Sequence, residues 1–102
     1  MSSGLSLSRV VWSTSGDRLY SFEQAAYFTQ TSVPLLERLV ALGLLEPDRA
    51  MLRRQDLVRV VQIQRLRRDL GLNLIGAAMV LDMAAEIAQL KAQLNAYRTT
   101  KN

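Results

Sequence analysis

The pattern of hydrophobic and polar residues predicts a mainly α-helical protein. Over most of the chain, apolar residues recur every three or four positions, which is the period that buries one face of a helix. The first predicted helix begins at Ser21, because Ser21 and Gln24 have the spacing of a capping box that satisfies the free amides of a helix start. An apolar stripe follows, and the helix is expected to end near Gln30.

A second short helix is predicted to follow Thr31 or Ser32. Pro34 lies in its first turn, where a missing backbone amide is tolerated, and Gly43 has the position of a left-handed helix end. Its buried face is expected to hold Leu35, Leu36, Leu39, Val40 and Leu42. Two short helices joined by about three residues, here 30–32, have the spacing of a helix-turn-helix.

Two longer helices are predicted after a break at residues 46–48 and a connector that runs to about residue 54. The third helix is predicted over residues 55–70 and ends at Gly71. Asn73 is a suitable N-cap for the fourth helix, which is predicted from residue 74 to about residue 98.

The fourth helix has two apolar faces. One face, which consists of Leu74, Ala78, Leu81 and Ala85, is expected to pack on the helix-turn-helix. The other has the three-and-four spacing of a coiled-coil seam, flanked by Glu86 and Lys91, and consists of Val80, Met83, Ile87, Leu90, Leu94 and Tyr97. This seam extends past anything a small core could cover, so it predicts a homodimer. The alternative is that both faces pack within one monomer.

The residues ahead of the first helix favour a short β-hairpin. Residues 8–13 and 18–20 have strand-forming character, and a Ser-Gly-Asp turn signal lies between them. Residues 1–8 are Ser-rich, are expected to be loosely ordered and lack the features of a signal peptide. The predicted organisation is therefore an N-terminal segment 1–20, a helix-turn-helix core 21–70 and a dimerising C-terminal helix 71–102.

Composition argues for a binding protein. A chain of 102 residues supports one domain. It contains no cysteine and no histidine, which removes disulfides, the commonest metal ligands and the commonest general base. We therefore expect no enzymatic activity, no metal and no cofactor.

The apolar run at residues 70–81 is far shorter than the ~20 residues of a membrane span, so a cytoplasmic location is expected.

Positive charge is concentrated in one stretch. The net charge is +4 and the pI about 10.1. Residues 49–68 contain seven arginines and a single acid, Asp56. One interpretation is a phosphate-contacting surface, and the other is a solvated helix face on which arginine stems cover apolar surface. The candidate phosphate-contacting residues are Arg49, Arg53, Arg54 and Arg59.

The second helix of the helix-turn-helix argues against DNA. Base reading favours Arg, Lys, Asn or Gln, and phosphate contacts favour cations. This helix instead carries Glu37 at its middle, and Glu46 and Asp48 follow closely. An acidic second helix would be repelled by DNA.

The same region resembles the helix-turn-helix of MerR-type regulators, which implies a winged helix-turn-helix fold. In that family a serine opens the second helix and a Gly-Leu-Leu-x-Pro run leads into the wing, and the matching residues are Ser32, Gly43, Leu44, Leu45 and Pro47. DNA-binding members place an arginine and two aromatic residues ahead of Glu-Arg, where residues 37–41 here are Glu-Arg-Leu-Val-Ala. Their Gly-Tyr-Arg-x-Tyr wing segment is also absent.

Three features in order resemble the bacterial chaperone-modulator family, the CbpM-like proteins. They are Leu-Gly-Leu-Leu-Glu-Pro at 42–47, Arg-Leu-Arg-Arg-Asp-Leu-Gly-Leu-Asn at 65–73, and Gly76 followed by a long Leu-rich helix. The resemblance covers roughly residues 20–97 and implies a regulator that binds the J-domain of a DnaJ-like or CbpA-like co-chaperone. Such a regulator inhibits or tunes the action of the co-chaperone on Hsp70 (DnaK).

We expect carboxylates to contact this partner, since J-domains present a basic face to Hsp70. The candidate partner-binding residues are Glu37, Arg38, Glu46 and Asp48. The alternative function is a MerR-type transcriptional regulator, similar to the heat-shock repressors, that uses the arginines of residues 49–68 on DNA phosphates. Steep loss of binding with salt would distinguish this alternative.

Overall fold

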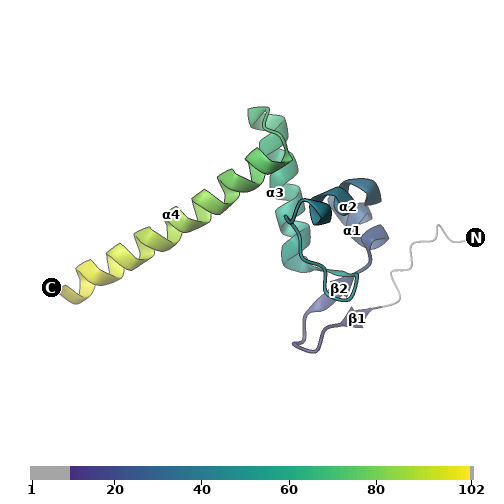
Figure 1. The fold of residues 1–102 in the computed structure, drawn as a ribbon. Helices are drawn as coiled ribbons and strands as arrows, with labels where there is room; N and C mark the ends of the chain where they lie inside the picture. The colour runs from purple at the N-terminus through teal and green to yellow at the C-terminus, as the bar shows by residue number, and fades with distance from the viewer. Residues whose placement is uncertain (1–9, 102) are drawn as a thin grey trace, which may run out of the picture.

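The computed structural model describes residues 10–101 and shows a small sheet, a cluster of three helices and a long helix that projects away from them (Figure 1). The predicted fold class, mainly helical with an N-terminal hairpin and a long C-terminal helix, is confirmed. In chain order the elements are β1 (Val11–Trp12), β2 (Arg18–Tyr20), α1 (Phe22–Thr29), α2 (Val33–Ala41), β3 (Leu52–Arg53), α3 (Arg54–Leu70) and α4 (Leu74–Lys101).

The predicted hairpin is confirmed for β1 and β2, which pair antiparallel with Val11 opposite Leu19. Its turn is closed by Ser13, whose backbone amide donates to the Asp17 carbonyl at 2.8 Å. A third strand, β3, was not expected and pairs with β2 to give the order β1-β2-β3. The Ser-rich segment 1–8 and the first residues of the predicted strand, up to residue 9, lie outside the described residues.

The helix-turn-helix is formed as the sequence predicts. The capping box of α1 is present, with the Gln24 amide donating to the Ser21 hydroxyl and the Ser21 amide donating to the Gln24 side chain, both at 3.0 Å. Gln30 takes the left-handed conformation after α1 (φ 56°) and turns the chain towards α2. Ser32 then caps α2 by accepting from the Leu35 amide at 3.3 Å.

The end of α2 follows the predicted glycine. Gly43 has a φ of 78°, and its amide donates to the Val40 carbonyl at 2.9 Å. The Leu44 amide donates to the Leu39 carbonyl at 2.9 Å, which completes a Schellman motif. Leu42 was predicted on the buried face, but it is 39% exposed because the chain has already left the helix there.

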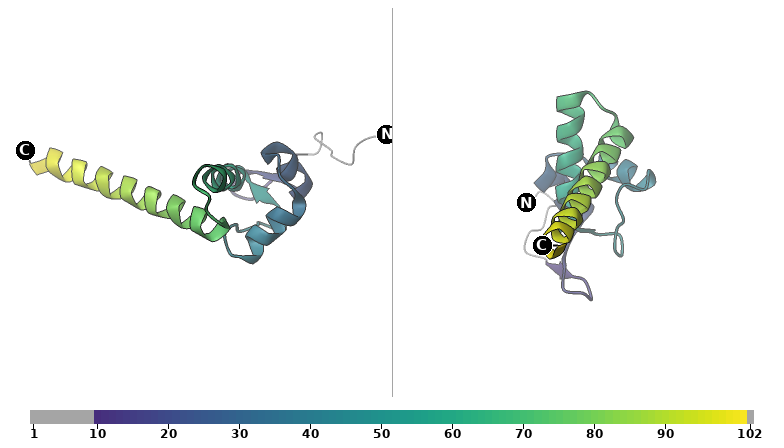
Figure 2. Two further views of the ribbon diagram at one scale, coloured as in Figure 1. Left: turned by 90° about the horizontal axis from the view of Figure 1, so that it is seen from above. Right: turned by 90° about the vertical axis from the view of Figure 1, so that its left-hand side faces the viewer.

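α3 begins one residue earlier than predicted and ends at Gly71 as expected. The Asp56 carboxylate accepts from the Arg53 amide at 2.9 Å and so stabilises the helix start. Asn73 caps α4 by accepting from the Gly76 amide at 2.7 Å. The short connection bends the chain by 109° between α3 and α4, and Figure 2 shows the projecting helix from two further sides.

The core lies between α1, α2, α3 and the start of α4. Its fully buried large side chains come from four elements, β2, α2, β3 and α3, and are Leu19, Leu36, Leu39, Leu52, Ile63 and Val60. Leu19 and Leu52 lie on paired strands, so β2 and β3 contribute to the same core as the helices. The small sheet is therefore part of the helix-turn-helix unit.

α4 is buried only at its beginning. Leu74, Ala77 and Ala78 pack into the core and Leu81 is half-buried, but Ala85 is exposed, so the predicted core face is one turn too long. The alternative in which both apolar faces pack within one monomer is wrong, because the seam residues are exposed. The radius of gyration is 17.0 Å, against about 13 Å for a compact domain of this size.

None of the helices within residues 10–101 is by itself long and apolar enough to cross a membrane. The bent pair α3 and α4 meets that length and composition only when the two helices are taken together.

Candidate functional site

The exposed side of α2 holds two of the predicted partner-binding residues. Glu37 and Arg38 are both exposed there. Arg38 borders a hollow of about 470 Å³ between α2 and the junction of α3 with α4. The other residues that line this hollow are Leu35, Leu42, Arg67, Asn73, Leu74 and Ile75. We call it the α2 hollow.

Apolar side chains in the α2 hollow are accessible. Leu42 is 39% exposed and Ile75 is 50% exposed. Both border the hollow beside Arg38. The α2 hollow therefore offers a partner apolar groups next to Arg38, and Glu37 lies outside its lining.

Glu46 lies elsewhere. It is exposed and lines a separate hollow of about 410 Å³, in which Arg53, Asp56 and Arg59 also take part. Gly43 and Leu44 line this second hollow, whereas Leu42 lines the α2 hollow. The end of α2 thus separates the two hollows, and Glu37 lines neither of them.

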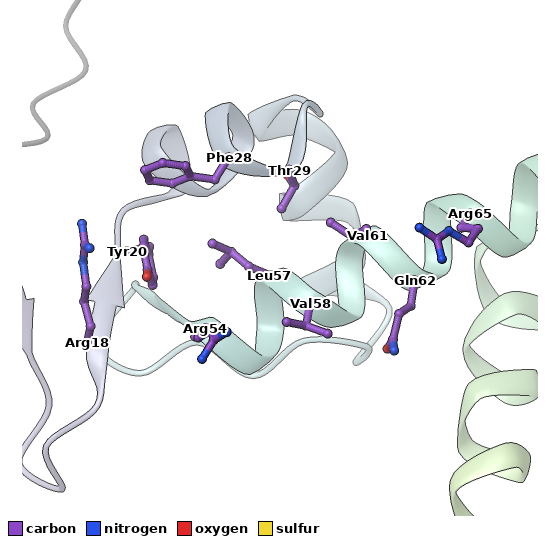
Figure 3. Close-up of a pocket in the computed structure, with 10 residues that line it drawn as sticks. All are labelled: Arg18, Tyr20, Phe28, Thr29, Arg54, Leu57, Val58, Val61, Gln62 and Arg65. Carbon is purple, nitrogen blue, oxygen red and sulfur yellow. The ribbon is translucent and has the colours of Figure 1, made fainter.

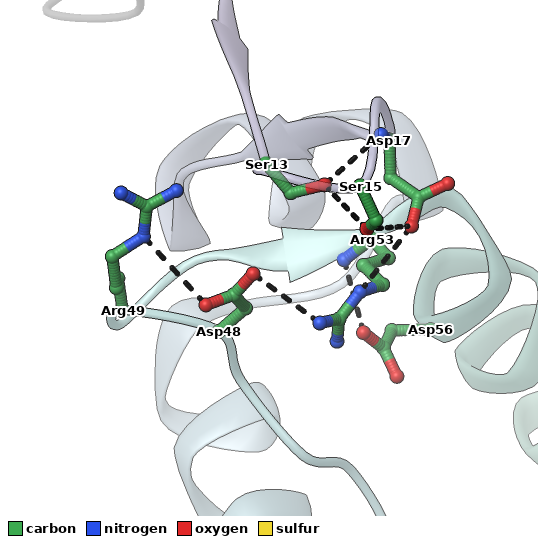
Figure 4. A network of polar contacts seen from close by, with 7 residues as sticks. All are labelled: Ser13, Ser15, Asp17, Asp48, Arg49, Arg53 and Asp56. Atoms are coloured by element: carbon green, nitrogen blue, oxygen red, sulfur yellow. Dashed lines mark hydrogen bonds and ion pairs between the residues drawn. The ribbon is translucent and has the colours of Figure 1, made fainter.

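Asp48 forms ion pairs within the chain (Figure 4). Its carboxylate pairs with Arg53 at 3.2 Å and with Arg49 at 3.7 Å, and its backbone bridges to Met51 around a tight turn. Arg49 and Ala50 take left-handed conformations in that turn, with φ of 52° and 62°. Asp48 therefore stabilises the short wing, and its carboxylate is less available to a partner than those of Glu37 and Glu46.

The four candidate phosphate-contacting arginines divide into two pairs. Arg53 bridges Asp48 and Asp17, the latter at 3.7 Å, and Arg59 pairs with Asp82 at 3.1 Å. Both side chains are about three-quarters buried, with 28% and 27% exposed. Arg49 and Arg54 are exposed. Arg49 and Arg53 share the Asp48 carboxylate and Arg59 is held by Asp82, so Arg54 is the one of these four without an ion pair to a described residue.

The predicted dimer seam runs along the projecting part of α4. All six of its residues are exposed, from Val80 at 36% to Tyr97 at 59%. A row of large apolar side chains on one helix face is unusual for a surface that remains in water. The seam is therefore available as an interface.

A groove that sequence reasoning missed lies between α1, β2 and α3 (Figure 3). It has a volume of about 430 Å³, an apolar floor and three arginines at its edges. The lining residues are Arg18, Tyr20, Phe28, Thr29, Arg54, Leu57, Val58, Val61, Gln62 and Arg65. We call it the arginine groove.

A local signal for this groove was present in the sequence. Arg54, Val58, Val61 and Arg65 follow one another at spacings of four, three and four, so they share one face of α3. Val58 and Val61 are 47% and 42% exposed, outside the buried stripe of Leu57, Val60 and Ile63. The opposite wall, from β2 and α1, depends on tertiary packing and has no signature in the local sequence.

Among residues 10–101 no group of three or more acidic side chains is arranged to hold a metal ion. The surface of the described residues carries two hollows around the end of α2, an apolar groove edged by arginines and an exposed helix seam.

Comparison with known families agrees with the helix-turn-helix geometry. The family model described as "MerR HTH family regulatory protein" matches residues 21–99, which is most of the chain and includes the helix-turn-helix, α3 and most of α4. No solved structure matches the chain significantly. The chain therefore belongs to the MerR helix-turn-helix family of regulatory proteins.

Proposed function

We propose that this protein is a bacterial chaperone modulator that binds the J-domain of a DnaJ-like or CbpA-like co-chaperone and inhibits or tunes its action on Hsp70. The observation that carries the proposal is the surface of α2. In this helix-turn-helix protein the second helix exposes the carboxylate of Glu37, and a hollow with accessible apolar side chains adjoins the flank of the same helix that carries Arg38. This combination suits a protein partner better than a DNA groove.

The positions of the arginines support the same proposal. Arg53 and Arg59 pair with carboxylates of this chain, and the exposed Arg49 pairs with Asp48, so three of the four candidate phosphate contacts already have an acidic partner. A DNA-binding surface needs cations that can exchange counterions for phosphates. Arg54 alone would make a small electrostatic contribution.

The chemistry of a J-domain complements the α2 surface, because its basic face would meet Glu37 and, across the end of α2, Glu46. Such charge pairs mainly set specificity and the association rate. Affinity comes from apolar anchors buried at the centre of an interface. Leu42 and Ile75 in the α2 hollow are the candidates for that role.

The proposal includes a homodimer without catalytic activity, in the cytoplasm. The seam on α4 supports the dimer, since a helix draws most of its stability from packing of its apolar face. Beyond Leu81 the helix lies in the open, with its side chains exposed up to residue 100. A second copy of α4 would cover the seam.

The test is direct titration of the purified protein with a J-domain by calorimetry, together with the J-domain-stimulated ATPase of Hsp70. Wild type is expected to bind and to change the stimulated ATPase rate. Glu37→Lys combined with Glu46→Lys is expected to weaken binding by about tenfold or more, because like charges are then opposed. Glu23→Lys makes the same kind of charge change at an exposed position of α1 and is the matched control.

The competing outcome is DNA binding, which membership of the family and the exposed Arg49 and Arg54 favour. If the protein is a transcriptional regulator, it should bind duplex DNA with an affinity that falls steeply with salt. Arg49→Ala combined with Arg54→Ala should then reduce that salt dependence. Such DNA binding, together with no affinity for a J-domain, would overturn the chaperone-modulator proposal.

A further inference from the structure

The arginine groove has the composition of a docking surface. The part of its lining that α3 contributes is aliphatic at Leu57, Val58 and Val61, and Leu57 points towards Tyr20 and Phe28 (Figure 3). Phe28, Val58 and Val61 remain between 42% and 47% exposed, so this apolar surface is open to a ligand. Large apolar side chains gathered in one hollow of a small protein mark an interaction site more often than an ordinary surface.

The three arginines at its edges are not neutralised by the chain. Within residues 10–101, Arg18, Arg54 and Arg65 have no carboxylate within ion-pair distance, in contrast to Arg53 and Arg59. The Nε atom of Arg18 is buried without a hydrogen-bond partner, and its guanidinium lies 4.7 Å from the ring centre of Tyr20. Uncompensated cations around an apolar floor favour a ligand that carries carboxylates.

The spacing on α3 fixes the shape of the ligand. Arg54 and Arg65 share a face with Val58 and Val61 and are 11 residues apart, which is about 16 Å along a helix. We propose that the arginine groove binds an acidic amphipathic segment of a partner protein. Apolar anchors of this segment pack on Val58 and Val61, and its carboxylates pair with Arg54 and Arg65 at the two ends.

Nucleic acid fits the groove less well. Single strands bind by stacking bases on exposed aromatic faces. Here Arg18 covers a face of Tyr20, and Tyr20 meets Phe28 edge to face with ring centres 5.9 Å apart. The floor offered by α3 is aliphatic. These features favour a peptide over a nucleic acid.

The groove is also separate from the surface proposed for the J-domain. A basic partner would be repelled by Arg18, Arg54 and Arg65, whereas it would be attracted to Glu37. The inference therefore does not depend on the proposed function, and the protein would engage partners of opposite charge at two sites.

The experiment is an amide-resolved NMR titration of the full chain with a synthetic amphipathic helix of about four turns, built from leucine anchors and glutamates. Shift changes are expected at Val58, Val61 and Phe28. Val58→Ser with Val61→Ser, and independently Arg54→Ala with Arg65→Ala, should each weaken binding by about tenfold or more. Arg49→Ala with Arg68→Ala removes two exposed arginines outside the groove and should bind as wild type does.

Five results would overturn the proposal. They are the absence of shift changes at millimolar peptide, equal binding of the same peptide with lysines in place of glutamates, and loss of binding only in the Arg49 and Arg68 control. The fourth is shift changes at Val58 and Val61 on concentrating the protein alone, which would assign the groove to a second copy. The fifth is displacement of the peptide by a duplex or single-stranded oligonucleotide that loses affinity in the Arg54 and Arg65 variant. This result would assign the groove to nucleic acid. Binding of the J-domain by both groove variants is measured in parallel and should be unchanged.

Discussion

Arg59 joins three parts of the molecule through one guanidinium. Its Nε donates to the backbone carbonyl of Leu44, just after α2, at 3.0 Å, and its Nη1 donates to the Asp82 carboxylate on α4 at 3.1 Å. The first contact satisfies a carbonyl of the α2 end, and the second orients the beginning of the projecting helix. Arg59 therefore couples the helix-turn-helix to the helix that carries the seam.

Replacement of Arg59 should destabilise the fold more than replacement of its acidic partner. Arg59→Ala removes a hydrogen bond to a backbone carbonyl and an ion pair, so the free energy of unfolding should fall by about 1–2 kcal/mol. Asp82→Asn should change it by about 0.5 kcal/mol or less, because that side chain is 68% exposed. Urea unfolding at one fixed protein concentration measures both. Equal effects would show that the contact with Leu44 contributes nothing.

Two leucines three residues apart should differ strongly in their contribution to stability. Leu39 is fully buried and Leu42 is 39% exposed at the α2 hollow. Leu39→Ala should cost about 2–5 kcal/mol, because it leaves a cavity in the core. Leu42→Ala should cost about 1 kcal/mol or less. If Leu42 is an anchor for the J-domain, its variant should instead weaken binding in calorimetry.

Gly43 should be required for its backbone conformation alone. Its φ is 78°, and a Cβ built there would meet no atom within 4 Å. Gly43→Ala should therefore cost about 1 kcal/mol through left-handed strain without a steric clash. In a domain of this size this corresponds to a fall in Tm of about 4–8 °C. Gly43→Asn should lose less, since asparagine tolerates this conformation, and a larger loss for asparagine than for alanine would contradict the assignment.

Local chemistry explains which parts of the fold could be predicted. The helix ends followed from short-range contacts, such as the capping box of Ser21 and Gln24 and the cap that Asn73 provides for α4. β3 could not be predicted, because two residues show no alternation and their strand exists only by pairing with β2. Leu42 was misplaced because the helical period was extended one residue past the end of α2.

The candidate sites also divide into features that depend on local sequence, which could be predicted, and features that depend on tertiary packing, which could not. Glu37 was correctly placed on the exposed side of α2, and the seam residues were correctly placed on a face of α4 that the core of one chain does not cover, since both depend on the periodicity of a single helix. The task of Asp48 was missed because the Arg53 side chain that it holds also pairs with Asp17, from the distant hairpin. The arginine groove was missed because its walls come from three elements.

The seam on α4 should determine the oligomeric state. Ile87→Asp combined with Leu90→Asp places two charges in the middle of the seam, which a packed helix pair cannot accommodate. Light scattering after gel filtration should then give a mass near 11.5 kDa, the mass of one chain, whereas wild type should give twice that value. Gln89→Asp is the matched control, because residue 89 is exposed on the same helix but lies off the seam. A wild-type mass of one chain would contradict the dimer, and a dimer that persists in the double variant would place the interface elsewhere.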